Sequence, residues 1–182
     1  MRLKPGSYLI LGMLDRGYET GYAIKRAVDR STRFFWAASL AQVYPELAAL
    51  EEDGYVVSAD EPHGARPRKT HRLTSKGRAA LNEWLRSERA PHLEFRDEGL
   101  LRVFFADAIA LDDALELVKR LRMRAEQIER EFRAEILPLA QRAPGRFPLI
   151  AAREGADYYA WRVTWLRNLE TELAEEGKAQ RS

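Results

Sequence analysis

The first pattern along the chain is a run of apolar residues near its start. Residues 8–14 are almost entirely apolar, which predicts a short helix over residues 5–16 that is buried on several sides. Gly17 can end this helix, and Thr20 is a suitable N-cap for a second helix over residues 21–31. A helix without a polar face needs a second layer of structure or another subunit to cover it.

A third helix is predicted by a capping box and by apolar periodicity. Ser39 can cap the backbone N–H of Gln42, and Gln42 can reach back to the backbone N–H of Ser39. The apolar residues that follow recur in steps of three and four and share one face: Leu40, Val43, Leu47 and Leu50. Gly54 can take the left-handed conformation that ends a helix. Pro45 removes an internal hydrogen bond at a cost of roughly 3 kcal/mol, so we expect a bent or loosened first turn.

Turn residues and β-branched residues replace the helical pattern after Gly54. Residues 55–59 and 68–73 are predicted strands, joined by a tip over residues 60–67 that contains Pro and Gly. Thr74 can then cap a fourth helix, in which three residues are expected to pack inward: Leu81, Trp84 and Leu85. Helices followed by a hairpin and another helix predict a winged helix-turn-helix.

The second half of the chain is predicted to be helical. A connecting helix is expected within residues 92–107, and a long helix begins at Asp112, whose charge favours a helix start. Apolar residues of the long helix repeat in steps of four and three: Ala114, Val118, Leu121, Ala125, Ile128 and Phe132. This heptad seam can pack within the chain or against a second copy. Prolines at positions 138, 144 and 148 predict a loop before a last helix over residues 150–175.

Basic residues concentrate in the first half of the chain. Residues 1–90 hold 15 Lys and Arg against 11 Asp and Glu, a net charge of +4, whereas the rest holds 15 against 17. Residues 62–78 contain six Lys and Arg and no acidic residue. A basic patch on a predicted hairpin is typical of nucleic-acid binders, and a solvated charge run is the alternative.

The third helix and the hairpin carry the candidate DNA contacts. Gln42 can both donate to and accept from a base edge, so we expect it to read sequence. Three residues are expected to position the helix on the duplex: Lys25, Ser39 and Tyr44. Three more are expected to meet phosphates or the minor groove at the tip of the hairpin: Arg66, Arg68 and Lys69.

Aromatic residues form two further groups. The first is expected in the core beneath the first three helices, or, for its last member, in the wall of an effector pocket: Phe34, Phe35 and Trp36. The second lies on the last helix and can line a pocket for a flat aromatic ligand, or pack between two copies of the chain: Tyr158, Trp161 and Trp165.

Several kinds of chemistry have no signature in the sequence. The chain has no cysteine, and its three histidines do not have metal-ligand spacing. We therefore expect no catalytic activity, metal or cofactor. No apolar run reaches the roughly 18 residues of a membrane span, and the N-terminus lacks the pattern of a signal peptide, so we expect a cytoplasmic protein. A winged-helix protein-interaction module and an aromatic-pocket enzyme are the alternative functions.

The motifs of the first half resemble those of PadR-family transcriptional regulators. The resemblance covers roughly residues 5–86 and rests on several short motifs: Gly21-Tyr22, Tyr44-Pro45, Leu47, Leu50, Gly54, Arg66-Pro67-Arg68-Lys69, Leu73-Thr74, Gly77 and Leu81. Two departures are His71, where the family commonly has tyrosine, and Ala65, which separates Gly64 from Arg66.

The resemblance implies an architecture and a function for the whole chain. The fold is expected to be mainly α with a small β-hairpin: a winged helix-turn-helix DNA-binding domain at residues 1–90 and a helical dimerisation and effector domain at residues 91–182. The resemblance to PadR members with a long C-terminal helical domain implies a homodimer built from the C-terminal helices and the apolar first helix. The expected partners are double-stranded DNA with a pseudo-palindromic operator and a small aromatic effector that releases a repressor.

Overall fold

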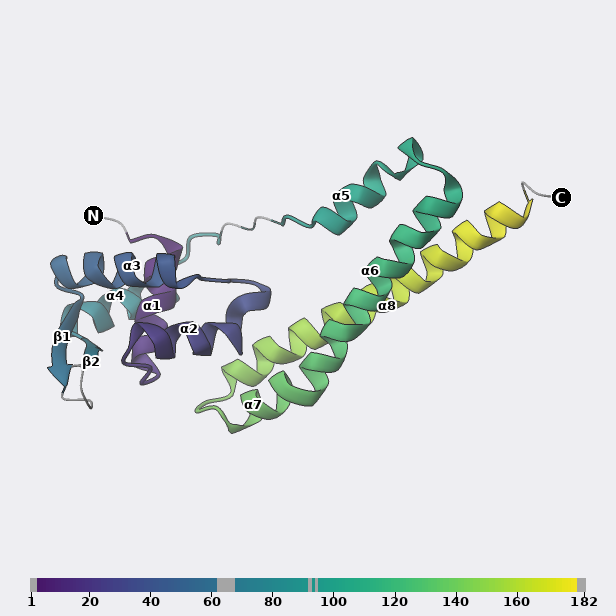
Figure 1. The fold of residues 1–182 in the computed structure, drawn as a ribbon. Helices are drawn as coiled ribbons and strands as arrows, with labels where there is room; N and C mark the ends of the chain where they lie inside the picture. The colour runs from purple at the N-terminus through teal and green to yellow at the C-terminus, as the bar shows by residue number, and fades with distance from the viewer. Residues whose placement is uncertain (1–2, 62–67, 92, 94, 180–182) are drawn as a thin grey trace. The chain divides into compact units, whose positions relative to one another are not determined.

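The computed structural model describes residues 3–61, 68–91, 93 and 95–179. The chain divides into two compact units, Met1–Ala90 and Pro91–Ser182. As the sequence predicts, the described fold is mainly α-helical and contains a small antiparallel hairpin (Figure 1).

The first unit has the element order of a winged helix-turn-helix. Its elements are α1 (Pro5–Asp15), α2 (Gly21–Asp29), a 3-10 turn (Thr32–Phe34), α3 (Leu40–Glu52), β1 (Val56–Glu61), β2 (Arg68–Leu73) and α4 (Ser75–Leu85). The strands pair antiparallel, with Val56 opposite Leu73 and Glu61 opposite Arg68. We refer to β1, β2 and the residues between them as the wing.

The apolar helix α1 lies at the centre of this unit. It packs against α2, α3, α4 and β2, and it buries four large side chains: Ile10, Leu11, Met13 and Leu14. Burial of each such side chain contributes about 1.5–3 kcal/mol. Elements of the same chain therefore cover the helix that the sequence shows to lack a polar face.

Side-chain caps fix the starts of two helices as predicted. The Thr20 hydroxyl accepts from the Ala23 N–H at 3.1 Å at the start of α2, and the Thr74 hydroxyl accepts from the Gly77 N–H at 3.1 Å at the start of α4. Gly54, with φ +73°, follows α3 in the left-handed conformation.

The prediction of burial is wrong for some aromatic and aliphatic residues of this unit. Phe35 and Trp36 are 64% and 41% exposed, because the 3-10 turn before them leads away from the packed helices. Leu85 is 65% exposed because it is the last residue of α4. Trp84 is also exposed at its edge, but its ring stacks on Tyr8 with centroids 4.7 Å apart.

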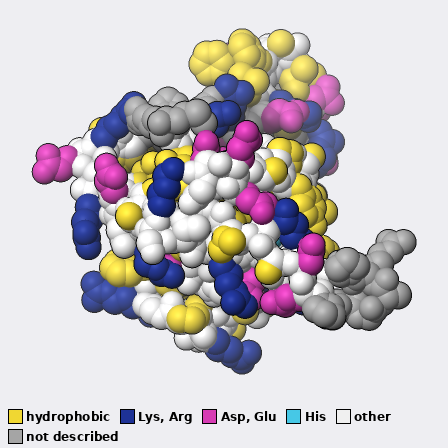
Figure 2. Space-filling view, turned by 90° about the vertical axis from the view of Figure 1, so that its left-hand side faces the viewer, with side chains coloured by type: hydrophobic (Ala, Val, Ile, Leu, Met, Phe, Trp, Pro, Cys, Tyr) yellow, Lys and Arg dark blue, Asp and Glu magenta, His cyan; other side chains and the backbone are white. Residues whose placement is uncertain are grey.

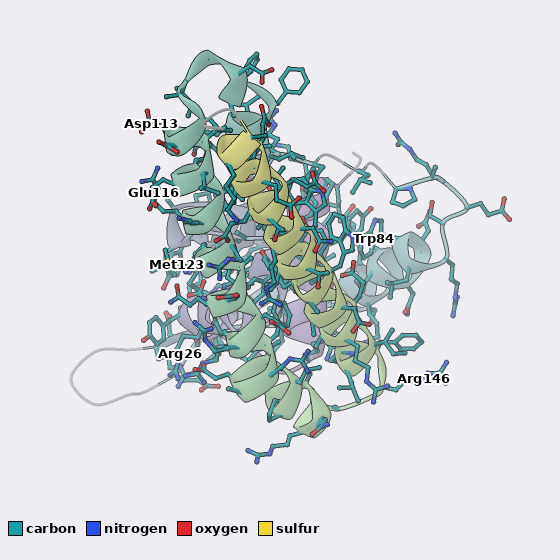
Figure 3. The ribbon with its side chains drawn as sticks, turned by 90° about the vertical axis from the view of Figure 1, so that its right-hand side faces the viewer. Arg26, Trp84, Asp113, Glu116, Met123 and Arg146 are labelled. Atoms are coloured by element: carbon teal, nitrogen blue, oxygen red, sulfur yellow. The ribbon has the colours of Figure 1, made fainter. Side chains whose placement is uncertain are left out.

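The second unit consists of helices only among the residues that the structure describes. These are α5 (Glu98–Phe104), a 3-10 turn (Ala106–Ala108), α6 (Leu111–Glu131), a π-helical segment (Phe132–Ile136), α7 (Leu137–Arg142) and α8 (Phe147–Ala179). Helices α6 and α8 lie side by side (Figures 1 and 3).

The heptad seam of α6 is buried within the chain. Val118 and Ala125 pack against Val163 and Leu166 of α8. The opposite side of α6 carries the exposed residues Asp113, Glu116 and Met123, which project away from α8 (Figure 3). Of the two alternatives that the sequence leaves open for the seam, the structure shows packing within the chain.

The predicted loop after α6 is largely helical. Pro138 occupies the second position of α7, where a missing N–H costs little. The preceding segment is π-helical, the kind of local rearrangement that accommodates such an irregularity. Gly155 of α8 allows close packing here, because a Cβ at this position would lie 2.6 Å from the Phe132 ring.

A buried ion pair anchors α5 to α8. Arg162 is only 8% exposed, and its Nη2 lies 2.6 Å from Asp97 Oδ2. The other Asp97 oxygen caps α5 by accepting from the Leu100 N–H at 3.0 Å. Asp97 thus fixes the start of the short helix α5 on the longer helix α8.

Candidate DNA-binding surface

Helix α3 presents one apolar face to the core and one polar face to solvent. Its buried residues are Val43, Leu47 and Leu50, whereas Gln42 and Tyr44 are exposed. Ser39 and Gln42 form the predicted capping box. The Ser39 N–H donates to Gln42 Oε1 at 2.8 Å, and the Ser39 hydroxyl donates to the same oxygen at 3.1 Å. The Gln42 oxygen is therefore occupied, while no hydrogen bond of its amide N–H groups is observed among the described residues.

The ring of Tyr44 lies directly against Gly21, the first residue of α2. A Cβ at Gly21 would stand 2.6 Å from Tyr44 Cε1, well below normal contact distance. Glycine at this position thus lets α2 and α3 pack through the tyrosine ring. Tyr44 remains 52% exposed, so it is accessible to a ligand as well as packed.

Pro45 interrupts α3 less than the sequence predicts. The helix continues from Leu40 to Glu52, and its first turn is closed by the capping box, so the loosened turn that we expected is not observed. Pro45 and Ala41 are both exposed. The Ala41 carbonyl, which loses its partner to the proline, is therefore within reach of water.

The basic residues of β2 differ in their partners. Lys69 Nζ lies 2.9 Å from Glu51 Oε2 in the last turn of α3. Arg68 is exposed and forms no ion pair within the part of the chain that the structure describes. Arg66 lies outside the described residues. The neighbours Arg68 and Lys69, for which the sequence predicts the same role, therefore differ in whether they form an ion pair within the described residues.

Helix α2 carries a paired and an exposed cation. Lys25 forms an ion pair with Asp29 one turn later, so its charge is partly balanced within the helix. Arg26 lies over the ring of Tyr22 at 5.8 Å, and both residues are exposed. Sequence reasoning did not single out this cation–π pair, although the separation of four residues is a signal for it.

A polar cluster joins the wing to the end of α3. Ser58 of β1 and His71 of β2 face each other, with Ser58 Oγ 2.8 Å from His71 Nδ1. The hydrogen bond from Lys69 lowers the pKa of the Glu51 carboxyl, and the Ser58 hydroxyl lowers this pKa further. Burial lowers the pKa of the His71 imidazole, and the positive charge of Lys69 acts in the same direction. At neutral pH, His71 is therefore uncharged and Glu51 is ionised.

The basic run of residues 62–78 is partly neutralised by carboxylates from other elements. Arg72 Nε lies 2.8 Å from Glu19 Oε1, and Arg78 pairs with Asp15. Figure 2 shows Lys and Arg side chains interspersed with Asp and Glu side chains on one face of the molecule. The surface of this unit is thus less uniformly positive than the sequence run suggests.

The candidate effector residues divide between the two units. Trp36 belongs to the first unit, whereas the other three form a row on α8. The ring centroids of Tyr158 and Trp161 are 5.8 Å apart, and those of Trp161 and Trp165 are 6.4 Å apart. An open groove of about 560 Å³ lies along this row, lined by Ile150, Arg153, Glu154, Asp157, Tyr158 and Trp161. Because α8 supplies every lining residue, the groove is a surface feature.

Comparison with known proteins relates the first unit to a family of regulators. The model of the transcriptional regulator PadR-like family matches residues 10–83, which extend from α1 into α4. This match spans less than half of the chain, so it shows a likeness of the first unit to that family. The match covers the helix-turn-helix and the wing, which carry the candidate DNA contacts.

Bacillus subtilis PadR resembles the chain in sequence and in fold. This negative transcriptional regulator is 30% identical over 113 residues, which are 62% of each protein. Its crystal structure in complex with operator DNA aligns with a TM-score of 0.82 at 22% identity, over 92% of this chain and 98% of the other. Its complex with p-coumaric acid aligns with a TM-score of 0.76 at 22% identity, over the same shares. At this identity the structural matches show the fold.

Among the described residues there is no group of His, Asp and Glu side chains that could hold a metal ion. No described helix is long and apolar enough to cross a membrane.

Proposed function

We propose that this PadR-like regulator binds operator DNA through α3 and the wing and represses transcription as a homodimer. The observation that carries the proposal is the arrangement of the first unit. Helix α3 buries its apolar face and exposes Gln42 and Tyr44, while β2 supplies the exposed cation Arg68. The operator complex of Bacillus subtilis PadR, which has the same fold, supports binding of operator DNA.

Gln42 is proposed to read bases as a hydrogen-bond donor. Its carboxamide oxygen accepts twice from Ser39, so the amide N–H groups are the part available to a base. Guanine offers N7 and O6 as acceptors in the major groove, and thymine offers O4. A bidentate contact with adenine needs the oxygen as well and would break the capping box.

Arg68 is proposed to contact a phosphate, and its loss tests DNA binding directly. Selection from random duplexes should yield a pseudo-palindromic site with half-site centres about 10–10.5 bp apart or a multiple of that distance. On this duplex, Arg68→Ala should weaken binding and reduce the slope of log K against log salt by about one. Salt titration of the wild type, Arg68→Ala and the control Arg86→Ala measures both effects.

The control and the wild type separate the outcomes. Arg86 directly follows α4, outside α3 and the wing, and carries the same charge as Arg68, so Arg86→Ala should keep the wild-type slope. An unchanged slope in Arg68→Ala would show that Arg68 contacts no phosphate. Absence of salt-sensitive binding by the wild type would overturn the DNA-binding proposal and favour a protein-interaction module.

A small aromatic molecule is proposed to release the operator. Support comes from the aromatic row on α8 and from the p-coumaric acid complex of Bacillus subtilis PadR. Adding p-coumaric acid and related phenolic acids to the operator complex should lower its affinity, and Trp161→Phe or Trp165→Phe should weaken this response. An identical response in both variants would exclude these rings as major contacts. A role of Trp36 in effector binding stays a prediction.

A further inference from the structure

The described cations of the wing differ in whether they form an ion pair with a carboxylate. Lys69 and Arg72 both point to carboxylates on other elements, at 2.9 Å from Glu51 and 2.8 Å from Glu19. Arg68, the neighbour of Lys69, forms no ion pair among the described residues. Among the described cations of the wing, Arg68 alone can therefore bind a phosphate without first breaking an ion pair.

Glu51 is placed to compete with DNA for Lys69. It lies in the last turn of α3, the helix whose exposed face carries the proposed base contact, and its carboxylate reaches the wing strand β2. The side chains of Lys69 and Glu51 are 54% and 35% exposed, so both remain accessible to a ligand. A DNA phosphate would enter a site where one anion already binds the ammonium group.

The physical properties of the pair favour exchange. An exposed ion pair contributes little stability, because water and salt screen it and the side chains lose freedom. A lysine ammonium group on a flexible four-carbon chain can turn from one anion to another. A phosphate of the duplex can therefore replace Glu51 as the partner of Lys69. The free energy of the broken Lys69–Glu51 ion pair is then subtracted from the free energy of DNA binding.

We propose that Glu51 sets the DNA affinity of this regulator by holding Lys69 until a phosphate displaces it. The inference rests on the proposed DNA-binding function and adds to it a residue that contacts no DNA itself. The glutamate opposes binding, so its removal should strengthen the complex.

A comparison of two neighbouring glutamates tests the proposal on the full-length protein. Glu51→Gln removes the anion from Lys69, whereas Glu52→Gln makes the same change of net charge at an exposed residue of the same helix for which no ion pair is observed within the described residues. Measured on the selected duplex, Glu51→Gln should raise affinity about two- to five-fold above Glu52→Gln, the range expected for an exposed pair.

A double-mutant cycle with Lys69→Gln identifies the partner. The advantage of Glu51→Gln over Glu52→Gln should vanish when Lys69 is also replaced, and Lys69→Gln should lower the salt slope by about one in both backgrounds. Glu51→Asp, which keeps the charge but shortens the side chain, should give an intermediate gain. Circular dichroism establishes that each variant is folded.

The outcomes distinguish this inference from the function on which it rests. Equal affinities of Glu51→Gln and Glu52→Gln would overturn it, as would a gain that persists without Lys69 or a loss of affinity in Glu51→Gln. Each of these results leaves wild-type DNA binding intact. Only a wild type without salt-sensitive binding would contradict the proposed function itself.

Discussion

The two units of this chain complete their cores to different extents. The first unit surrounds α1 with three helices and a strand, and its buried residues form one cluster. The second unit pairs two long helices along a smaller cluster and leaves apolar residues of α5 and the residue after it uncovered: Leu101, Phe104 and Phe105 are 56%, 75% and 60% exposed. An exposed apolar surface of this kind is typical of a protein-interaction site.

This difference indicates where a second copy would bind. The α6 seam is covered by α8, and the large apolar side chains of α1 are covered by their own unit, whereas Trp161 of the aromatic row on α8 is 57% exposed. The exposed face of α5 is an alternative, and Asp97 and Arg162 hold that helix in place. We propose that α5 contributes to the homodimer.

The largest expected effect is on the free energy of unfolding, when a buried leucine of either core is truncated to alanine. Leu11 and Leu166 are both fully buried, one in each unit. Leu11→Ala and Leu166→Ala should each lower the free energy of unfolding by about 2–5 kcal/mol through lost burial and a residual cavity. Denaturant titration followed by circular dichroism measures the loss. The control Leu85→Ala, at an exposed position, should stay within about 0.5 kcal/mol of the wild type.

The next effect concerns association through α5. Burial of a phenylalanine contributes about 1.5–3 kcal/mol, and a twofold interface counts each change twice. Phe104→Glu should therefore raise the dimer dissociation constant at least about 100-fold in sedimentation experiments. Phe35→Glu, at a similarly exposed aromatic residue of the first unit, is the control and should leave association unchanged. A dimer unaffected by Phe104→Glu would place the interface elsewhere.

The smallest effect concerns pH and the wing. Burial lowers the pKa of His71 in the folded protein relative to 6.5, so folding favours the uncharged imidazole. This contribution to stability is complete above the unfolded pKa and is lost as pH falls below about 6.5 toward the lower folded pKa. His71→Gln should therefore lose less stability than the wild type between pH 7.5 and 5.5 in denaturant titrations. An equal loss in both proteins would show that His71 does not contribute.

Local sequence signals predicted the first unit well. Caps at Thr20, Ser39 and Thr74, the glycine after α3 and the spacing of apolar residues depend on contacts within a few positions of the chain. The same signals failed where an element ends. Phe35 and Leu85 look like core residues, but the turn or helix end that carries them directs them to solvent.

In the candidate DNA-binding surface, too, some features follow from local sequence signals and others do not. Exposure of Gln42 and Tyr44 follows from the period of a helix whose other face is apolar. The partner of Lys69 does not follow from any local rule, because Glu51 is 18 positions away and meets it only when the wing folds beside α3.

The period of apolar residues in α6 predicted a buried seam, and the fold confirms that it is buried. Periodicity specifies which face of a helix must be covered but not which helix covers it, since α8 and a second copy offer similar apolar surfaces. Local capping, helical period and the wing motif were therefore readable from the amino-acid order. Three contacts depend on long-range packing: α6 with α8, Asp97 with Arg162, and Glu51 with Lys69. Each joins residues that only the folded chain brings together.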